Sequence, residues 1–149
     1  MIDKTIYEKL ANYCAYQERC VVDVKQKLQK LKVDKEEFNA YINKLKTANF
    51  LNEDRYVKYF VAARTKKKWG KAKIKSALCV KRIDSSIVQK YLDDIDVENY
   101  EEQMRLAAEK KWKTIKGETL RERKTKLMRF LLSKGYEMDR IVKAIKAFE

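Results

Sequence analysis

Residues 71–92 read KAKIKSALCVKRIDSSIVQKYL and contain two pairs of apolar side chains at helical spacing. Ile74 and Leu78 lie four residues apart, as do Val88 and Leu92, and residues at this spacing occupy one face of a helix. Ile83 falls between the two pairs, where the helical period is interrupted. The segment therefore predicts two short amphipathic helices joined at Ile83.

The same apolar pattern occurs on both sides of this segment. Fifty residues earlier it falls on Val24, Leu28, Val33, Phe38 and Ile42, and fifty-three residues later on Leu127, Leu131, Tyr136, Ile141 and Ile145. All fifteen positions are apolar although apolar residues make up only 45% of the chain, so generic amphipathic helices drifting into phase are a poor explanation. Units this small cannot close a core alone and must stack on their neighbours.

The sequence thus predicts an all-α fold of three tandem three-helix repeats, each with a helix-turn-helix-like pair, in an elongated, curved array. We expect the repeats at 1–50, 51–98 and 99–149. Asp34 with Glu37, and Thr119 with Glu122, have the spacing at which a cap side chain and a glutamate satisfy each other's backbone donors. The expected helices span 5–17, 21–31, 35–48, 53–67, 71–81, 85–94, 101–113, 120–134 and 138–148.

Composition excludes several classes of protein. The 149 residues are enough for a real core, and the absence of His and Pro excludes His-dependent hydrolase triads and favours long helices. Three cysteines cannot all pair within one chain, which fits a reducing compartment. No apolar run approaches 18 residues and the first thirty residues carry scattered charges. We therefore expect an unprocessed cytoplasmic protein with no membrane segment, cofactor or metal, and a monomer.

The charge is strongly uneven along the chain. Of the net +14, residues 61–90 contribute +9, with ten Lys or Arg against Asp84. Residues 105–149 are basic as well, whereas residues 91–104 carry six carboxylates and no base, which marks the join between the second and third repeats. A concentration of this kind suits phosphates or an acidic protein surface, although it also fits a solvated face that serves solubility. The candidate binding residues are Lys66, Lys67, Lys68, Trp69, Lys71, Lys73, Lys75, Arg82, Lys111, Arg123 and Lys126.

The aromatic and cysteine residues read mainly as packing residues. Trp69 and Trp112 follow lysines and could stack a base, but tryptophan at a helix end more often seals a core edge. We expect core or half-buried positions for Tyr13, Tyr16, Tyr56, Tyr59 and Tyr91, and small packing roles for Cys14, Cys20 and Cys79.

Two further segments carry a family resemblance. Residues 51–64, LNEDRYVKYFVAAR, lead through a basic turn with Gly70 to Ile74 and Leu78, and residues 130–136, FLLSKGY, are followed by Ile141. Together with the repeats, they resemble the RecX family of bacterial recombinase regulators over nearly the whole chain. The chain departs from the family pattern at Cys20-Val-Val-Asp23, where a Ser-x-x-Glu cap is usual, and at Arg82, where glycine is frequent.

The resemblance implies a curved molecule that lies in the groove of the RecA filament on DNA. It implies that the protein limits filament extension and lowers ATPase and strand exchange, in DNA recombination, repair and the SOS response. The net charge of +14 separately predicts sequence-nonspecific binding to single- and double-stranded DNA. From the residues alone, a basic helix-turn-helix-like nucleic-acid-binding protein acting without a recombinase stays open, as does a scaffold for another acidic protein. An enzyme is the least favoured class, since no general base, metal set or phosphate loop can be named.

Overall fold

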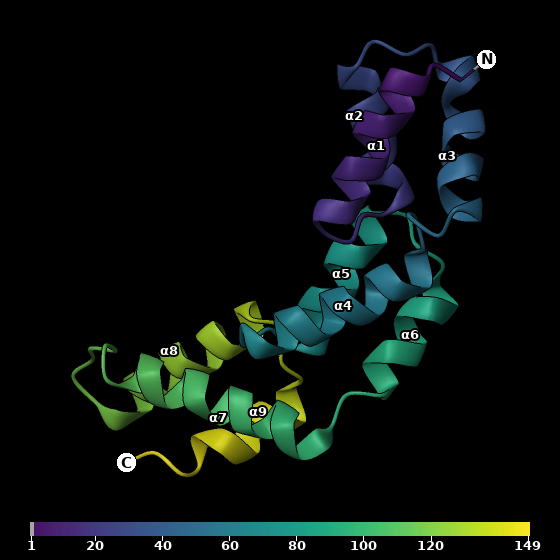
Figure 1. The fold of residues 1–149 in the computed structure, drawn as a ribbon. Coiled ribbons are helices and arrows are strands. Elements are labelled where there is room, and N and C mark those ends of the chain that lie inside the picture. The colour runs from purple at the N-terminus through teal and green to yellow at the C-terminus, as the bar shows by residue number, and fades with distance from the viewer. Residues whose placement is uncertain (1) are drawn as a thin grey trace.

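The computed structural model describes residues 2–149, which form nine α-helices and one short 3₁₀ helix (η1) with no strand among them. The array runs from the N-terminal helices at the upper right of Figure 1 to the C-terminal helices at the lower left, and it bends on the way. The elements are α1 (Lys4–Tyr16), α2 (Val21–Lys30), η1 (Lys35–Glu37), α3 (Phe38–Thr47), α4 (Glu53–Lys66), α5 (Lys71–Val80), α6 (Ser85–Asp93), α7 (Val97–Trp112), α8 (Leu120–Ser133) and α9 (Met138–Ile145).

Three apolar clusters hold three groups of three helices, which confirms the predicted all-α class. The first unit packs around Leu28 and Leu45, the second around Ile74 and Leu78, and the third around Leu127. Twelve of the fifteen repeat positions are buried, and Val33, Phe38 and Ile145 are half-buried. The exact boundaries at residues 50 and 98 stay a prediction.

Two helix starts differ from the expectation. Asp34 makes no side-chain cap bond, and the chain instead enters α3 through η1. Helix α7 begins at Val97, four residues early, because the Asp96 carboxylate accepts a hydrogen bond from the Asn99 amide at 2.9 Å. At α8 the Thr119 hydroxyl caps the Glu122 amide as predicted, but the Glu122 carboxylate accepts from the amide of Glu118.

Some side chains predicted to pack lie in solvent. Tyr16 and Tyr59 are 83% and 54% exposed, and Cys79 is exposed on α5, so the packing prediction is wrong for these three. Cys79 directly follows the buried Leu78, and consecutive helical residues point about 100° apart, which turns Cys79 outward. Cys14 and Cys20 are buried as expected.

The first and second units are joined at the start of α2. The Val21 amide donates to a Glu53 carboxylate oxygen on α4 at 2.9 Å, and Cys20 packs into the core of the second unit. Asp23 accepts from the Cys20 amide at 3.2 Å and from the Lys81 ammonium group at 2.6 Å. Burial alone would raise the pKa of the Asp23 carboxyl, but the hydrogen bonds from Lys81 and Cys20 outweigh it, so this pKa lies below its ordinary value.

Replacing Asp23 by Asn should lower the free energy of unfolding by about 1–3 kcal/mol at pH 7, because a half-buried Lys81 loses its ionic acceptor. A carboxyl whose pKa is depressed in the folded state stabilises the protein at pH values above its unfolded pKa of about 3.9. This stabilisation is lost as the pH falls through the pKa of the folded state. The gap between wild type and Asp23→Asn in urea unfolding should therefore narrow below about pH 4. The control, Asp34→Asn, removes an exposed carboxylate without a cap bond, and an equal loss there would contradict the assignment.

The turn between the second and third helices has the same backbone conformation in each unit. Lys32, Arg82 and Gly135 occupy equivalent places in the repeat and have φ values of 61°, 55° and 93°. Arg82 thus adopts the left-handed conformation that glycine accommodates most easily. Within residues 2–149, no helix is both long enough and apolar enough to span a bilayer.

Candidate functional site

The second and third units meet through two glycines. The Gly70 amide donates to the Lys134 carbonyl at 2.7 Å, and the Ala72 amide donates to the Gly135 carbonyl at 3.1 Å. A Cβ atom at Gly70 would lie 2.1 Å from the Gly135 carbonyl carbon, and one at Gly135 would lie 2.4 Å from the Lys73 nitrogen. The backbones approach this closely only because neither residue has a side chain. In Figure 1 the contact lies where the end of α4 meets the end of α8.

A tyrosine from the third unit completes the contact. The Tyr100 hydroxyl on α7 accepts a hydrogen bond from the Lys71 amide at 2.9 Å and donates to a Glu137 carboxylate oxygen. Two causes raise the pKa of the Tyr100 phenol above its ordinary value: mainly its burial, and in addition its hydrogen bond to Glu137. Arg140 donates to the other Glu137 oxygen at 3.2 Å, which fixes that carboxylate. The first two amides of α5, those of Lys71 and Ala72, are therefore held by the third unit.

The predicted basic residues of the turn gather around this contact. We define the basic junction as residues 66–70 and the first turn and a half of α5, seated on residues 134–136. None of its lysine ammonium groups forms an ion pair with another described residue. These lysines are Lys66, Lys67, Lys68, Lys71, Lys73 and Lys75.

Lys134 joins the same charge cluster from the third unit, which the sequence did not indicate. Burial lowers the pKa of the Lys134 ammonium group, and the positive charges of Lys73 and Lys68 lower it further. Like charges brought together in this way oppose folding slightly and favour an anionic partner. The only available signal was that Lys134 and Lys68 each stand shortly before a glycine at the end of a helix.

Trp69 is half-buried and packs against protein, as predicted. Its ring meets Phe60 edge-on with centroids 6.4 Å apart, and it borders the core of the second unit. The Lys73 ammonium group lies 4.2 Å from the ring centroid, and the Arg64 guanidinium 4.8 Å. The tryptophan therefore holds two cations at the junction. Trp112 packs likewise, against Phe148.

The remaining candidate residues lie elsewhere. Arg82 lies beyond the far end of α5, whose ten residues extend about 15 Å from the junction at 1.5 Å per residue. Arg123 lies 3.9 Å over the Trp112 ring and donates to the Trp112 carbonyl, and Lys126 donates to the Lys116 carbonyl at 2.6 Å. Both brace the loop between α7 and α8. Lys111 lies over the Phe130 ring at 5.1 Å.

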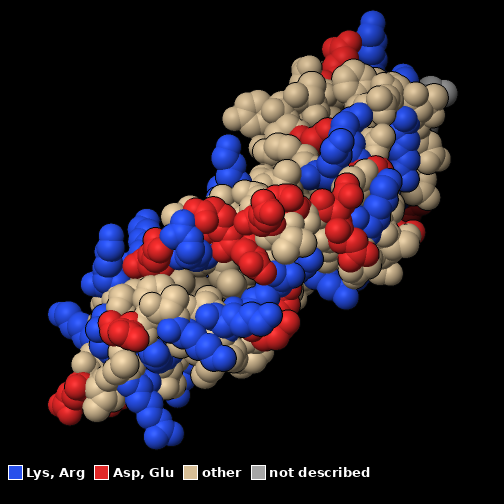
Figure 2. Space-filling model, turned by 90° about the horizontal axis from the view of Figure 1, so that it is seen from below, with Lys and Arg blue, Asp and Glu red and all other residues tan. Residues whose placement is uncertain are grey.

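Carboxylates separate the basic zones on one side of the array. Viewed from below, acidic side chains gather around the middle of the molecule, with basic ones to either side (Figure 2). The acid run between residues 93 and 102 supplies six exposed carboxylates at the end of α6 and the start of α7. The positive charge of the protein is therefore concentrated in patches.

Among the described residues no group of three or more Cys, Asp or Glu is arranged to hold a metal ion. The basic junction offers lysine ammonium groups and uncompensated positive charge, which attract anions. Fold and site together define a class: a helical-repeat protein whose basic surface suits a polyanionic partner.

Comparison with known proteins specifies the family. Residues 52–92 match the model of the second three-helix domain of RecX, and residues 98–145 match that of the third. The regulatory protein RecX of Vibrio parahaemolyticus is 32% identical over 123 residues, covering 83% of this chain and 78% of the relative. That of Clostridium perfringens strain 13 is 33% identical over 119 residues, covering 78% and 56%. The chain belongs to the RecX family.

Solved structures agree with this assignment. The crystal structure of RecX from Lactobacillus salivarius superposes with a TM-score of 0.81 at 27% identity, covering 96% of this chain and 94% of that one. Another RecX crystal structure, at 22% identity, shows the same fold, with a TM-score of 0.87 and coverage of 97% of this chain and 72% of that one. The chain spans a little over half the length of the clostridial relatives it matches. The expectation of a regulator, and not an enzyme, agrees with the names of these relatives.

Proposed function

We propose that this protein binds the RecA recombinase filament on DNA and inhibits its extension, ATP hydrolysis and strand exchange, with the basic junction as a main contact. The observation that carries the proposal is the set of lysines at the contact between the second and third units that form no ion pair with a described residue. A nucleoprotein filament is an extended polyanion, and its sugar-phosphate backbone attracts such a cluster without regard to sequence. Membership of the RecX family supports the choice of a recombinase as the protein component.

Reversing Lys67, Lys68 and Lys71 to Glu should raise the amount of protein needed for half-inhibition by about tenfold or more, because attraction becomes repulsion at close range. The measurement is ATP hydrolysis by RecA on single-stranded DNA during titration with each protein. The wild type should suppress turnover well below one molecule per recombinase subunit. Lys67 is exposed and Lys68 and Lys71 are half-buried without an ion pair, so melting temperature should change only modestly, since surface charges rarely contribute more than about 1 kcal/mol each.

The matched control reverses three exposed lysines of the first unit, Lys9, Lys25 and Lys35, and changes the net charge by the same amount. It should inhibit like the wild type. If the junction variant also inhibits like the wild type, the junction is only a solvated face.

A second experiment tests the alternative function by the fluorescence anisotropy of labelled single-stranded DNA. Affinity for DNA alone should fall steeply from about 50 to 200 mM salt. A wild type that binds DNA but leaves filament ATPase unchanged would favour a nucleic-acid-binding protein acting without a recombinase.

A further inference from the structure

An apolar groove lies between α8 and α9 on the outer side of the third unit. Its volume is about 460 Å³, and its floor is formed by Leu120, Met128, Val142 and Ile145. Leu120 and Val142 remain 43% and 45% exposed. Apolar side chains grouped on one surface in this way cost free energy in water and are typical of an interaction site.

The charges around this groove are all of one sign. Arg121, Lys124 and Lys146 border it, no carboxylate lines it, and none of the three pairs with an acid within residues 2–149. The groove therefore combines an apolar floor with positive edges that are free to meet acidic groups.

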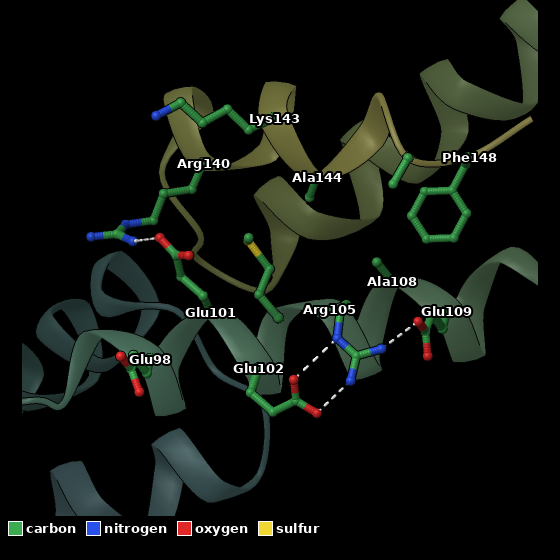
Figure 3. A pocket seen from close by; sticks show the side chains of 12 residues that line it. Glu98, Glu101, Glu102, Arg105, Ala108, Glu109, Arg140, Lys143, Ala144 and Phe148 are labelled. Carbon is green, nitrogen blue, oxygen red and sulfur yellow. Dashed lines mark hydrogen bonds and ion pairs between the residues drawn. The ribbon is translucent and has the colours of Figure 1, made fainter.

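A second groove, on the opposite face of α9, is lined by charges of both signs. That groove, between α7 and α9, has a volume of about 550 Å³ and is lined by four glutamates (Figure 3). Its arginines are already satisfied: Arg105 pairs with Glu102 and Glu109, each at 2.5 Å, and Arg140 pairs with Glu101 at 2.5 Å. Of these two grooves, the α8–α9 groove is the one in which no lining cation has an ion pair with a described residue.

The dimensions suit a helix. Residues 120–128 of α8 extend about 12 Å, which matches a little over two turns of a partner helix. An amphipathic helix places residues i, i+3, i+4 and i+7 on one stripe, and residues flanking that stripe would reach Arg121 and Lys124 on one edge and Lys146 on the other.

We propose that the α8–α9 groove binds an amphipathic helix of the recombinase subunit whose apolar stripe is flanked by Asp or Glu. This inference rests on the proposed function, because it assigns the groove to the protein component of the filament. The basic junction then contacts the polyanionic part of the filament, and the third unit supplies a separate, partly apolar contact.

The test is the double variant Leu120→Asp/Val142→Asp, with Val80→Asp as control, because Val80 is 77% exposed on α5, away from the groove. Co-sedimentation with recombinase filaments on single-stranded DNA should show about tenfold weaker binding for the double variant and no change for the control. Anisotropy with naked single-stranded DNA should be the same for all three proteins, and so should the helical circular dichroism. Unchanged filament binding by a folded double variant would overturn the inference.

A second test does not depend on whether the double variant folds. It places a photo-crosslinking amino acid at position 142 or at position 80 of the otherwise unchanged chain. Position 142 should crosslink to a recombinase segment with apolar residues at three- and four-residue spacing and acidic neighbours, and position 80 should not. A crosslink at position 142 to a second copy of this chain, or none at all, would overturn the groove assignment. If the wild type fails to bind filaments, the proposed function falls together with the inference, whereas a wild type that binds while the groove tests fail leaves the proposed function standing.

Discussion

Leu78→Asp is expected to unfold at least the middle unit. Leu78 is fully buried in the cluster that includes Ile74 and Val88. A carboxylate there would lose its hydration without gaining a partner, which costs several kcal/mol by order of magnitude, a large part of the total stability of a small domain. Circular dichroism during thermal melting should show reduced helix at 25 °C or a much lower transition temperature.

The matched control is Val80→Asp, two residues along the same helix, where the side chain is 77% exposed. This variant should melt within a few degrees of the wild type, since substitutions on an open surface usually change stability by less than about 0.5 kcal/mol. A soluble, fully helical Leu78→Asp protein with the transition of the control would contradict the assignment of the core.

Gly70→Ala should separate the second and third units. The Gly70 φ of −82° is ordinary, so the only obstacle is contact: the new methyl group would lie 2.1 Å, 2.2 Å and 2.3 Å from backbone atoms of Gly135 and Tyr136. Backbone atoms cannot rotate out of the way as a side chain can, and overpacking costs about 1–3 kcal/mol or more. Limited proteolysis should cleave around residues 66–75 and 134–137 well before it cleaves the wild type, and filament inhibition should weaken.

Gly117→Ala is the control for this change. A methyl group at Gly117 would lie 3.0 Å from Arg123 Cγ and 3.3 Å from Glu122 Cβ and Oε2, which is tight but about 1 Å farther than the backbone atoms that a methyl group at Gly70 would meet. Its proteolysis pattern and inhibition should match the wild type. If both alanine variants resist protease equally, the glycine contact does not hold the units together.

The core could be predicted from sequence because burial imposes a period on the residues themselves. Ile74, Leu78 and their equivalents in the other units follow the spacing of helical faces, and each unit repeats it. The start of α7 could not be placed, because Asp96 lies in an acid run that resembles a linker and reveals its cap only through the bond to Asn99. Composition also does not say which way Tyr16 or Cys79 points.

The candidate site was predicted only in part. Lysines close in sequence stay close in space, so the segment 66–75 was found, whereas Lys134 is 64 residues from Gly70 and meets it through backbone bonds that leave no periodic trace. Arg123 and Lys126 lie apart from this segment. Their positive charge predicts a partner surface, and in the structure they also donate hydrogen bonds to the carbonyls of Trp112 and Lys116.

The hydrogen bonds at the starts of α2 and α5 have a mechanical consequence. In each case the first amide of the second helix is held by the first helix of the next unit, through Glu53 or Tyr100. The array thus behaves as rigid segments connected by two joints, and any rotation at a joint is amplified with distance. A rotation of about 10° at the second joint would move the far end of the sixteen-residue α7 by about 4 Å, because the helix is about 24 Å long. Substitutions at the joints therefore change the angle between neighbouring units. They displace distant surfaces whose own residues are unchanged.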